Sequence, residues 1–158
     1  MKYRRLTKEQ LEEMHPEFIN FLAAQSITAD EWETIKKEKP NVAEDEIDVF
    51  SDLVWEGVLG KVAYLENITA TEMHLFHLAE KEMSLIAVRV HQPGVDLTTE
   101  PGFEWFKKNF LTDAVDMMTA KKAYSEDKNK DKFQLIEKGA VITKGELFRY
   151  FDDIIEIE

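Results

Sequence analysis

Four carboxylates recur at helical spacing near the middle of the chain, at positions i, i+3, i+7 and i+11: Asp45, Asp48, Asp52 and Glu56. A helix would carry all four on one strip. Carboxylate oxygens suit Mg²⁺, through which such a strip can hold a pyrophosphate. That substrate also needs basic residues near its phosphates, and Lys61 is the only one on this segment. We therefore interpret the strip as the solvated face of an amphipathic helix. Metal-dependent phosphate chemistry, or mimicry of a nucleic acid, is the alternative.

A second group of oxygen ligands imitates a calcium-binding loop. Asp127, Asn129 and Asp131 reproduce its first three ligand positions. The remainder departs from the pattern, because Lys132 stands where Gly makes the sharp turn and Lys138 stands where Glu closes the site. We predict a polar loop before a helix and no calcium.

The histidines offer a third possible metal site. There are four: His15, His74, His77 and His91. On a helix His74 and His77 would share a face and, with a third ligand, hold a metal, whereas on a strand their odd spacing sends them to opposite faces. Neither His-Glu-x-x-His nor a pair of Glu-x-x-His motifs is present. We predict no metal, and we expect at least one histidine to be partly buried and hydrogen-bonded.

Motifs for nucleophilic or nucleotide chemistry are absent from the sequence. None of the four serines lies in a Gly-x-Ser-x-Gly elbow, and the six glycines form neither a phosphate loop nor a dinucleotide fingerprint. The lack of cysteine excludes thiol catalysis, disulfides and thiolate metal sites. We predict no cofactor and no particular catalytic residue. Whether the protein is an enzyme stays open, since catalytic residues can converge only in the fold.

The tryptophans are candidate core or partner residues. Trp32, Trp55 and Trp105 lie among apolar neighbours, which favours burial. Trp32 and Trp105 also lie near proline and charged residues, and either one, if exposed, would mark a binding site for a partner protein.

Helices are expected to position most of these residues. A capping side chain stands three residues before an acid or amide at four places: Thr7 and Gln10, Thr28 and Glu31, Asn41 and Glu44, Thr143 and Glu146. We predict a helix after Thr7 that Pro16 kinks or splits near His15, a second over 29–39 that stops at Pro40, and a central helix over 42–65.

The pattern changes over residues 73–91. Alternating apolar residues predict an antiparallel hairpin that turns at 80–82, although a helix is the alternative. Further helices are expected after Thr99, over 132–138 and over 144–155, while 113–124 is either a strand or a helix. The fold class predicted is α+β: a predominantly helical single globular domain, residues 1–158, with a small antiparallel β-hairpin or sheet.

Composition limits the classes of partner. The 158 residues include 32 acidic and 20 basic side chains, giving a formal charge of −12, which disfavours nucleic acids and anionic membrane surfaces. The longest stretch without a charged residue, 18–29, has 12 residues against about 20 needed to cross a bilayer. The basic residues of 1–5 precede no apolar segment, so we expect no secretory signal and a cytoplasmic location.

Three segments carry a family resemblance: LTKEQLEEMHPEFINFLAAQSITADEW (6–32), DVFSDLVWEGVL (48–59) and KGAVITKGELFRYF (138–151). They resemble a family of small, uncharacterised bacterial proteins, a domain of unknown function, over essentially the whole chain. The resemblance implies a bacterial, soluble, single-domain protein and supplies no catalytic residue.

These observations favour a non-catalytic cytoplasmic domain, adaptor or regulator, that binds another protein through an acidic helical surface. A contiguous exposed apolar patch ringed by acids, around Trp32 or Trp105, would support it. The alternative is a small enzyme or ligand-binding domain, metal-dependent or not, with a pocket between the central helix and the hairpin. There His74 or His77 would meet Glu72 or an aspartate of the central helix. A homo-oligomer is expected from general frequencies alone.

Overall fold

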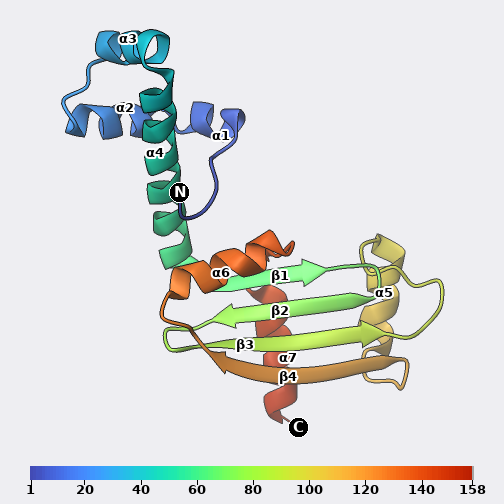
Figure 1. Ribbon diagram of the computed structural model, residues 1–158. Helices are drawn as coiled ribbons and strands as arrows, with labels where there is room; N and C mark the ends of the chain where they lie inside the picture. The colour runs from blue at the N-terminus through green and yellow to red at the C-terminus, as the bar shows by residue number, and fades with distance from the viewer. Residues whose placement is uncertain (158) are drawn as a thin grey trace. The chain divides into compact units, whose positions relative to one another are not determined.

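The computed structural model describes residues 1–157 and divides the chain into two compact units, Met1–Gly60 and the residues from Lys61 onward. The described residues form seven helices and a five-stranded antiparallel sheet (Figure 1). The predicted α+β class, rich in helix with a small antiparallel sheet, is therefore confirmed. The boundaries of one domain over 1–158 stay a prediction.

The N-terminal unit is made of four helices: α1 (Lys8–Glu13), α2 (His15–Ala24), α3 (Ala29–Glu38) and α4 (Pro40–Lys61). Thr7 caps α1 in a capping box with Gln10, and Thr28 caps α3. The chain breaks between α1 and α2, as Pro16 predicted. The cap predicted at Asn41 is wrong because α4 already begins at Pro40, where a ring-fixed φ suits the first turn and no N–H is needed.

Aromatic side chains form the centre of this unit. The ring of Phe18 lies 5.0 Å from that of Phe50 and 5.2 Å from that of Trp32, and both pairs meet edge to face. Trp32 is only 7% exposed, so it belongs to the core and does not mark a partner site. Trp55 and Trp105, which lies in the other unit, are both partly buried.

The second unit contains the sheet, in the order β4-β3-β2-β1-β5: β1 (Tyr64–Ile68), β2 (Glu72–Leu78), β3 (Glu82–Val90), β4 (Val115–Ala123) and β5 (Val141–Ile142). The predicted hairpin is β2–β3, and 113–124 contains a strand, not a helix. The central helix was predicted to reach Leu65, but α4 ends at Lys61 and Leu65 lies in β1, paired with Phe76. Its backbone N–H and C=O groups are thereby satisfied by β2.

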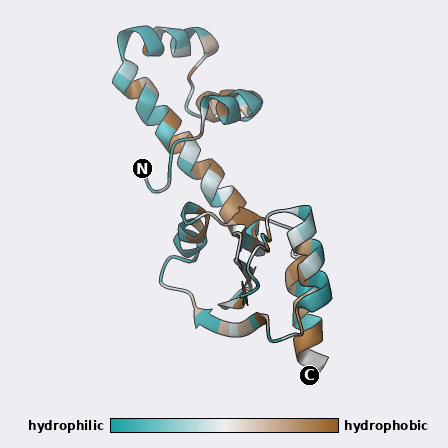
Figure 2. Cartoon of the chain, turned by 90° about the vertical axis from the view of Figure 1, so that its right-hand side faces the viewer, coloured by the Kyte–Doolittle hydropathy of each residue, from teal (hydrophilic) through white to brown (hydrophobic). Residues whose placement is uncertain are grey.

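Helices pack on both faces of this sheet. Helices α5 (Glu100–Asn109) and α7 (Glu146–Ile157) pack on one face, and α6 (Lys128–Glu137) lies on the other (Figures 1 and 2). Phe106 of α5 and Phe151 of α7 join Leu75 and Ile86 in the core of the first face. On the second face α6 leaves part of the sheet uncovered, and Met118 is 61% exposed.

The ends of the later helices depend on local side chains. Thr99 caps α5 as predicted, while α6 begins four residues earlier than predicted because Asp127 caps it. Thr143 was predicted to cap the last helix, but α7 begins at Glu146 and the Thr143 hydroxyl accepts from the N–H of Gly145, one residue before the helix.

Candidate functional site

The carboxylate strip of α4 binds the start of the chain. We call residues 2–6 the N-terminal arm. The Asp52 carboxylate accepts from the backbone N–H of Lys2 at 2.7 Å and from that of Tyr3 at 2.9 Å. Glu56 accepts from the ammonium of Lys2 at 2.8 Å and from the hydroxyl of Tyr3. Burial, helped by this bond to Glu56, raises the pKa of Tyr3 to about 12.

The rest of the arm is held in the same way. Arg5 donates to Asp48 at 2.6 Å, and this bond lowers the pKa of the Asp48 carboxyl. The backbone N–H of Leu6 donates to the fully buried hydroxyl of Ser51 at 3.1 Å. Three of the four carboxylates are therefore half-buried receptors for a basic segment. The predicted solvated face is wrong for these three and holds for Asp45, which is exposed.

A second, apolar line of side chains on α4 is open to solvent. Val42, Val49 and Leu53 are 43%, 52% and 55% exposed, and at about 100° per residue they lie within about 40° of one another around the helix. We call these three residues the α4 stripe. Asp45 and Glu46 flank it. Figure 2 shows apolar segments alternating with polar ones along this helix.

The calcium-like residues have structural partners. Asp127 caps α6 by accepting from the backbone N–H of Lys130 at 3.1 Å. The two carboxylate oxygens of Asp131 accept from the backbone N–H and the hydroxyl of Ser125, both at 2.7 Å. Within residues 1–157 no group of three or more histidine or acidic residues is arranged to hold a metal ion.

The histidines are dispersed. His74 and His77 lie on β2, where the odd spacing places them on opposite faces of the sheet. The His77 ring stacks on Tyr64 with centroids 4.7 Å apart, on the face covered by α7. His91 lies with its Nε2 2.5 Å from a carboxylate oxygen of Asp116. His15, the first residue of α2, is exposed.

Glu72, the acid expected to meet a histidine, is bound by an arginine instead. It lines a shallow depression on the α6 face together with His74, but its carboxylate accepts two hydrogen bonds from Arg89, at 2.5 and 2.9 Å. These bonds lower the pKa of Glu72. Glu72 and Arg89 therefore form a cross-strand ion pair.

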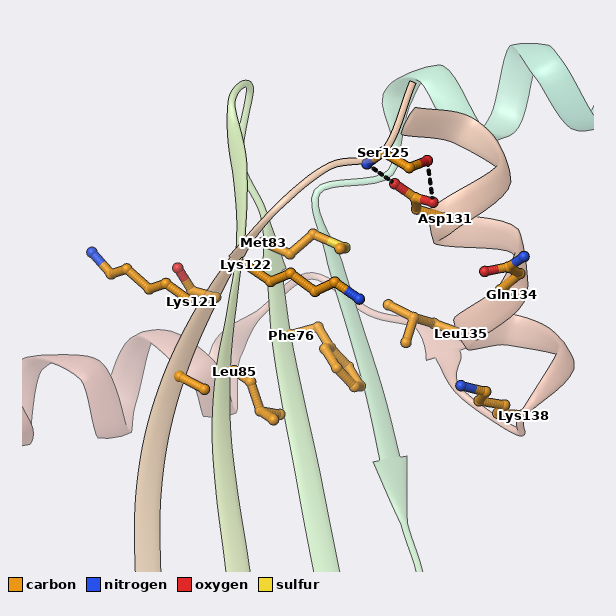
Figure 3. Close-up of a pocket in the computed structure, with 12 residues that line it drawn as sticks. Phe76, Met83, Leu85, Lys121, Lys122, Ser125, Asp131, Gln134, Leu135 and Lys138 are labelled. Atoms are coloured by element: carbon orange, nitrogen blue, oxygen red, sulfur yellow. Dashed lines mark hydrogen bonds between the residues drawn. The ribbon is translucent and has the colours of Figure 1, made fainter. Parts of the chain in front are cut away.

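The hairpin does line a cavity, of about 290 Å³, but its other wall is α6 and not the central helix (Figure 3). Phe76, Met83 and Leu85 reach into it from the sheet, and Leu135 reaches in from α6. Lys122 and Lys138 also line it, as do Ser125, Asp131 and Gln134. Sequence reasoning considered Asp131 and Lys138 only as positions of the calcium-like loop, and it missed that these residues meet at one cavity, although one signal was available. The hairpin strands are apolar on both faces, which is typical of a sheet that is covered on both sides.

No helix among the described residues combines the length and the apolar composition needed to span a membrane.

Comparison with known proteins adds one positive finding. No curated protein and no solved structure matches the chain. A family model described as "Family of unknown function (DUF6495)" matches residues 1–156, which confirms the resemblance to a domain of unknown function and leaves the bacterial origin a prediction. The chain belongs to this family of unknown function.

Proposed function

We propose that the protein is a non-catalytic binding domain whose α4 stripe accepts a basic amphipathic helix of a partner protein. The observation that carries the proposal is the exposure of Val42, Val49 and Leu53 along one side of a 22-residue helix. Exposed apolar side chains along one side of a helix, bordered by charges, are a usual form of a surface that another helix covers.

Charge decides which partner fits. Helix α4 carries six carboxylates and a single basic residue, Lys61. Residues 1–60 contain fourteen acidic and seven basic residues, a formal net charge of −7. A second copy of this helix would place carboxylates against carboxylates, whereas a basic segment would be attracted to the same surface. The proposed occupant is therefore a basic helix of another protein.

The N-terminal arm supports this choice, because α4 already binds a segment of that chemistry. Lys2 and Arg5 donate to its carboxylates while Tyr3 and Leu6 are buried beside it. A partner helix with basic residues flanking an apolar side would make the same two kinds of contact on the stripe. We place this interaction in the bacterial cytoplasm, as the family resemblance and a chain without cysteine led us to expect.

The test uses a labelled three-heptad peptide of leucine and lysine as the probe, with a leucine and glutamate peptide as its acidic counterpart. Binding to the full chain is followed by fluorescence anisotropy. The variant Val49→Ser/Leu53→Ser replaces two of the three apolar residues of the stripe and leaves the charge of the surface unchanged. Val58→Ser is the matched control, since Val58 is 39% exposed on the opposite side of the same helix.

We expect the basic peptide to bind the wild type and Val58→Ser equally, to bind Val49→Ser/Leu53→Ser at least tenfold more weakly, and to dissociate as salt is raised. Equal binding to all three proteins, or equal binding of the acidic peptide, would contradict the proposal. So would a wild-type dimer, seen by sedimentation, that Val49→Ser/Leu53→Ser dissociates, since the occupant would then be a second copy.

A further inference from the structure

We propose that the cavity between α6 and the sheet binds a small amphiphilic anion, a carboxylate or phosphate monoester attached to an apolar chain. The site lies within the second unit and does not depend on the α4 stripe. Its volume of about 290 Å³ is at the small end for small-molecule sites and equals about ten water molecules at roughly 30 Å³ each. A ligand of about ten non-hydrogen atoms would fill it.

The apolar chain would lie on the sheet. Phe76, Met83 and Leu85 occupy the face that α6 covers incompletely, and all three are only partly buried. Leu135 faces them from α6 (Figure 3). A ligand chain placed among these four residues would remove both its own apolar surface and theirs from water.

The charged group would lie between two lysines. Lys122, on β4, pairs in register with Met83, and its ammonium points across the cavity towards α6 (Figure 3). Lys138 lies at the lower end of the cavity as drawn, just after α6. Within residues 1–157 neither ammonium forms an ion pair with a carboxylate, although the chain contains 32 acidic residues. Two unpaired ammonium groups beside an apolar floor fit an anion with an apolar chain.

The other polar residues leave this arrangement intact. The negative charge of Asp131 lies at the upper end of the cavity as drawn, where Ser125 donates to both of its oxygens. Lys121 is the neighbour of Lys122 on the strand, but its side chain points away from the cavity and its ammonium lies 3.6 Å from Glu82. The side chains of Lys121 and Lys122 therefore lie on opposite faces of the sheet. A substitution of Lys121 can serve as the control for a substitution of Lys122.

The test is titration of the full-length protein, followed by NMR chemical shifts of the Met83 and Leu135 methyl groups. The probes are octanoate, octyl phosphate, octanol and acetate, all below micellar concentration. We expect both octyl anions to bind with a dissociation constant on the order of 1 mM, and octanol and acetate to bind at least fivefold more weakly. Comparison of octanoate with octyl phosphate identifies the preferred headgroup.

Charge-neutral variants locate the anion. Lys122→Gln and Lys138→Gln should each weaken octanoate about fivefold to tenfold, and Lys121→Gln should leave the affinity within twofold of the wild type. Circular dichroism confirms that all three remain folded. The proposal is overturned if octanol binds as tightly as octanoate, if Lys121→Gln weakens binding as much as Lys122→Gln, or if no probe shifts these methyl groups at 10 times the expected dissociation constant.

Discussion

Replacing Asp52 by Asn is expected to release the N-terminal arm from α4. The carboxylate accepts two backbone hydrogen bonds, one from Lys2 and one from Tyr3, and the amide of Asn can accept only one. Its NH₂ group would face the other N–H, donor against donor. Asn has almost the same size as Asp, so the change removes charge and one acceptor and leaves packing as it is.

The expected loss is about 2 kcal/mol. Hydrogen bonds to a charged acceptor contribute roughly 1.5–3 kcal/mol when buried and less when exposed. The bond from Tyr3 is part-buried and that from Lys2 is exposed. We assign about 1–1.5 kcal/mol to the bond that is lost, whose N–H then faces the amide NH₂, and about 0.5–1 kcal/mol to the weakening of the retained bond when its acceptor becomes neutral. Since 1.4 kcal/mol is a factor of ten, the undocked population of the arm should rise about thirtyfold.

Limited trypsin digestion measures that population. Cleavage after Arg5 requires the arm to leave α4, and with dilute protease its rate follows the population of the open form. Mass spectrometry of the released peptide should show cleavage about thirtyfold faster in Asp52→Asn than in the wild type. The matched control is Asp45→Asn, because Asp45 is exposed on the same helix and accepts no hydrogen bond from another described residue.

Two results would refute this reasoning. If Asp52→Asn and Asp45→Asn are cleaved after Arg5 at the same rate, the carboxylate does not hold the arm. If cleavage after Lys36 in α3 accelerates by the same factor as cleavage after Arg5, the arm has no separate opening and the substitution has destabilised the whole unit.

Three further predictions concern stability. Gly102→Ala should lower the free energy of unfolding by about 2–4 kcal/mol, because a Cβ there would lie 1.7 Å from the backbone oxygen of Asp96 in the preceding loop. Gly60→Ala should raise the free energy of unfolding by about 0.5–1 kcal/mol, because Gly60 lies in a helix and its Cβ would meet open space. Urea denaturation measures both changes. The bond from Arg5 lowers the pKa of Asp48. The stability that this bond contributes is therefore present above the ordinary pKa of 3.8 and is lost as the pH falls through the lower pKa of the folded state. Acid titration of Arg5→Gln, monitored by its unfolding, should show no such loss. Burial lowers the pKa of Lys132 from 10.5, so below pH 10.5 there is a range in which the unfolded chain binds a proton that the folded chain lacks. The free energy of unfolding therefore rises with pH in that range. Urea denaturation at successive alkaline pH values should show a smaller rise for Lys132→Met than for the wild type.

The elements that could be predicted are those specified by neighbouring residues. Thr7, Thr28 and Thr99 cap helices because their hydroxyls accept from an N–H three residues on. The β2–β3 hairpin followed from alternation of apolar residues over a few positions. These signals involve short separations along the chain, so a single sequence contains all the information needed.

Two of the errors lie where a distant segment decides the outcome. Val62 and Leu65 continue the apolar spacing of α4, so a helix was expected to reach Leu65. Pairing with β2 instead makes this segment a strand. In the same way the last helix was predicted over 144–155, but α7 spans Glu146–Ile157, so both ends were misplaced by two residues. At its start, the backbone N–H of Thr143 donates to the distant carbonyl of Tyr64 in β1.

The sequence alone determined the fold class, the family, the charge and the absence of the familiar catalytic motifs. Only the tertiary structure decided what the carboxylates of α4 do, because their partners in the N-terminal arm are 43 to 54 residues away in the chain. It also brought Phe76, Lys122 and Lys138 to one cavity and separated Lys122 from Lys121. The physical reason is the same in each case. Helix caps and strand alternation are set by local backbone geometry, whereas binding surfaces are made by side chains that only long-range packing brings together.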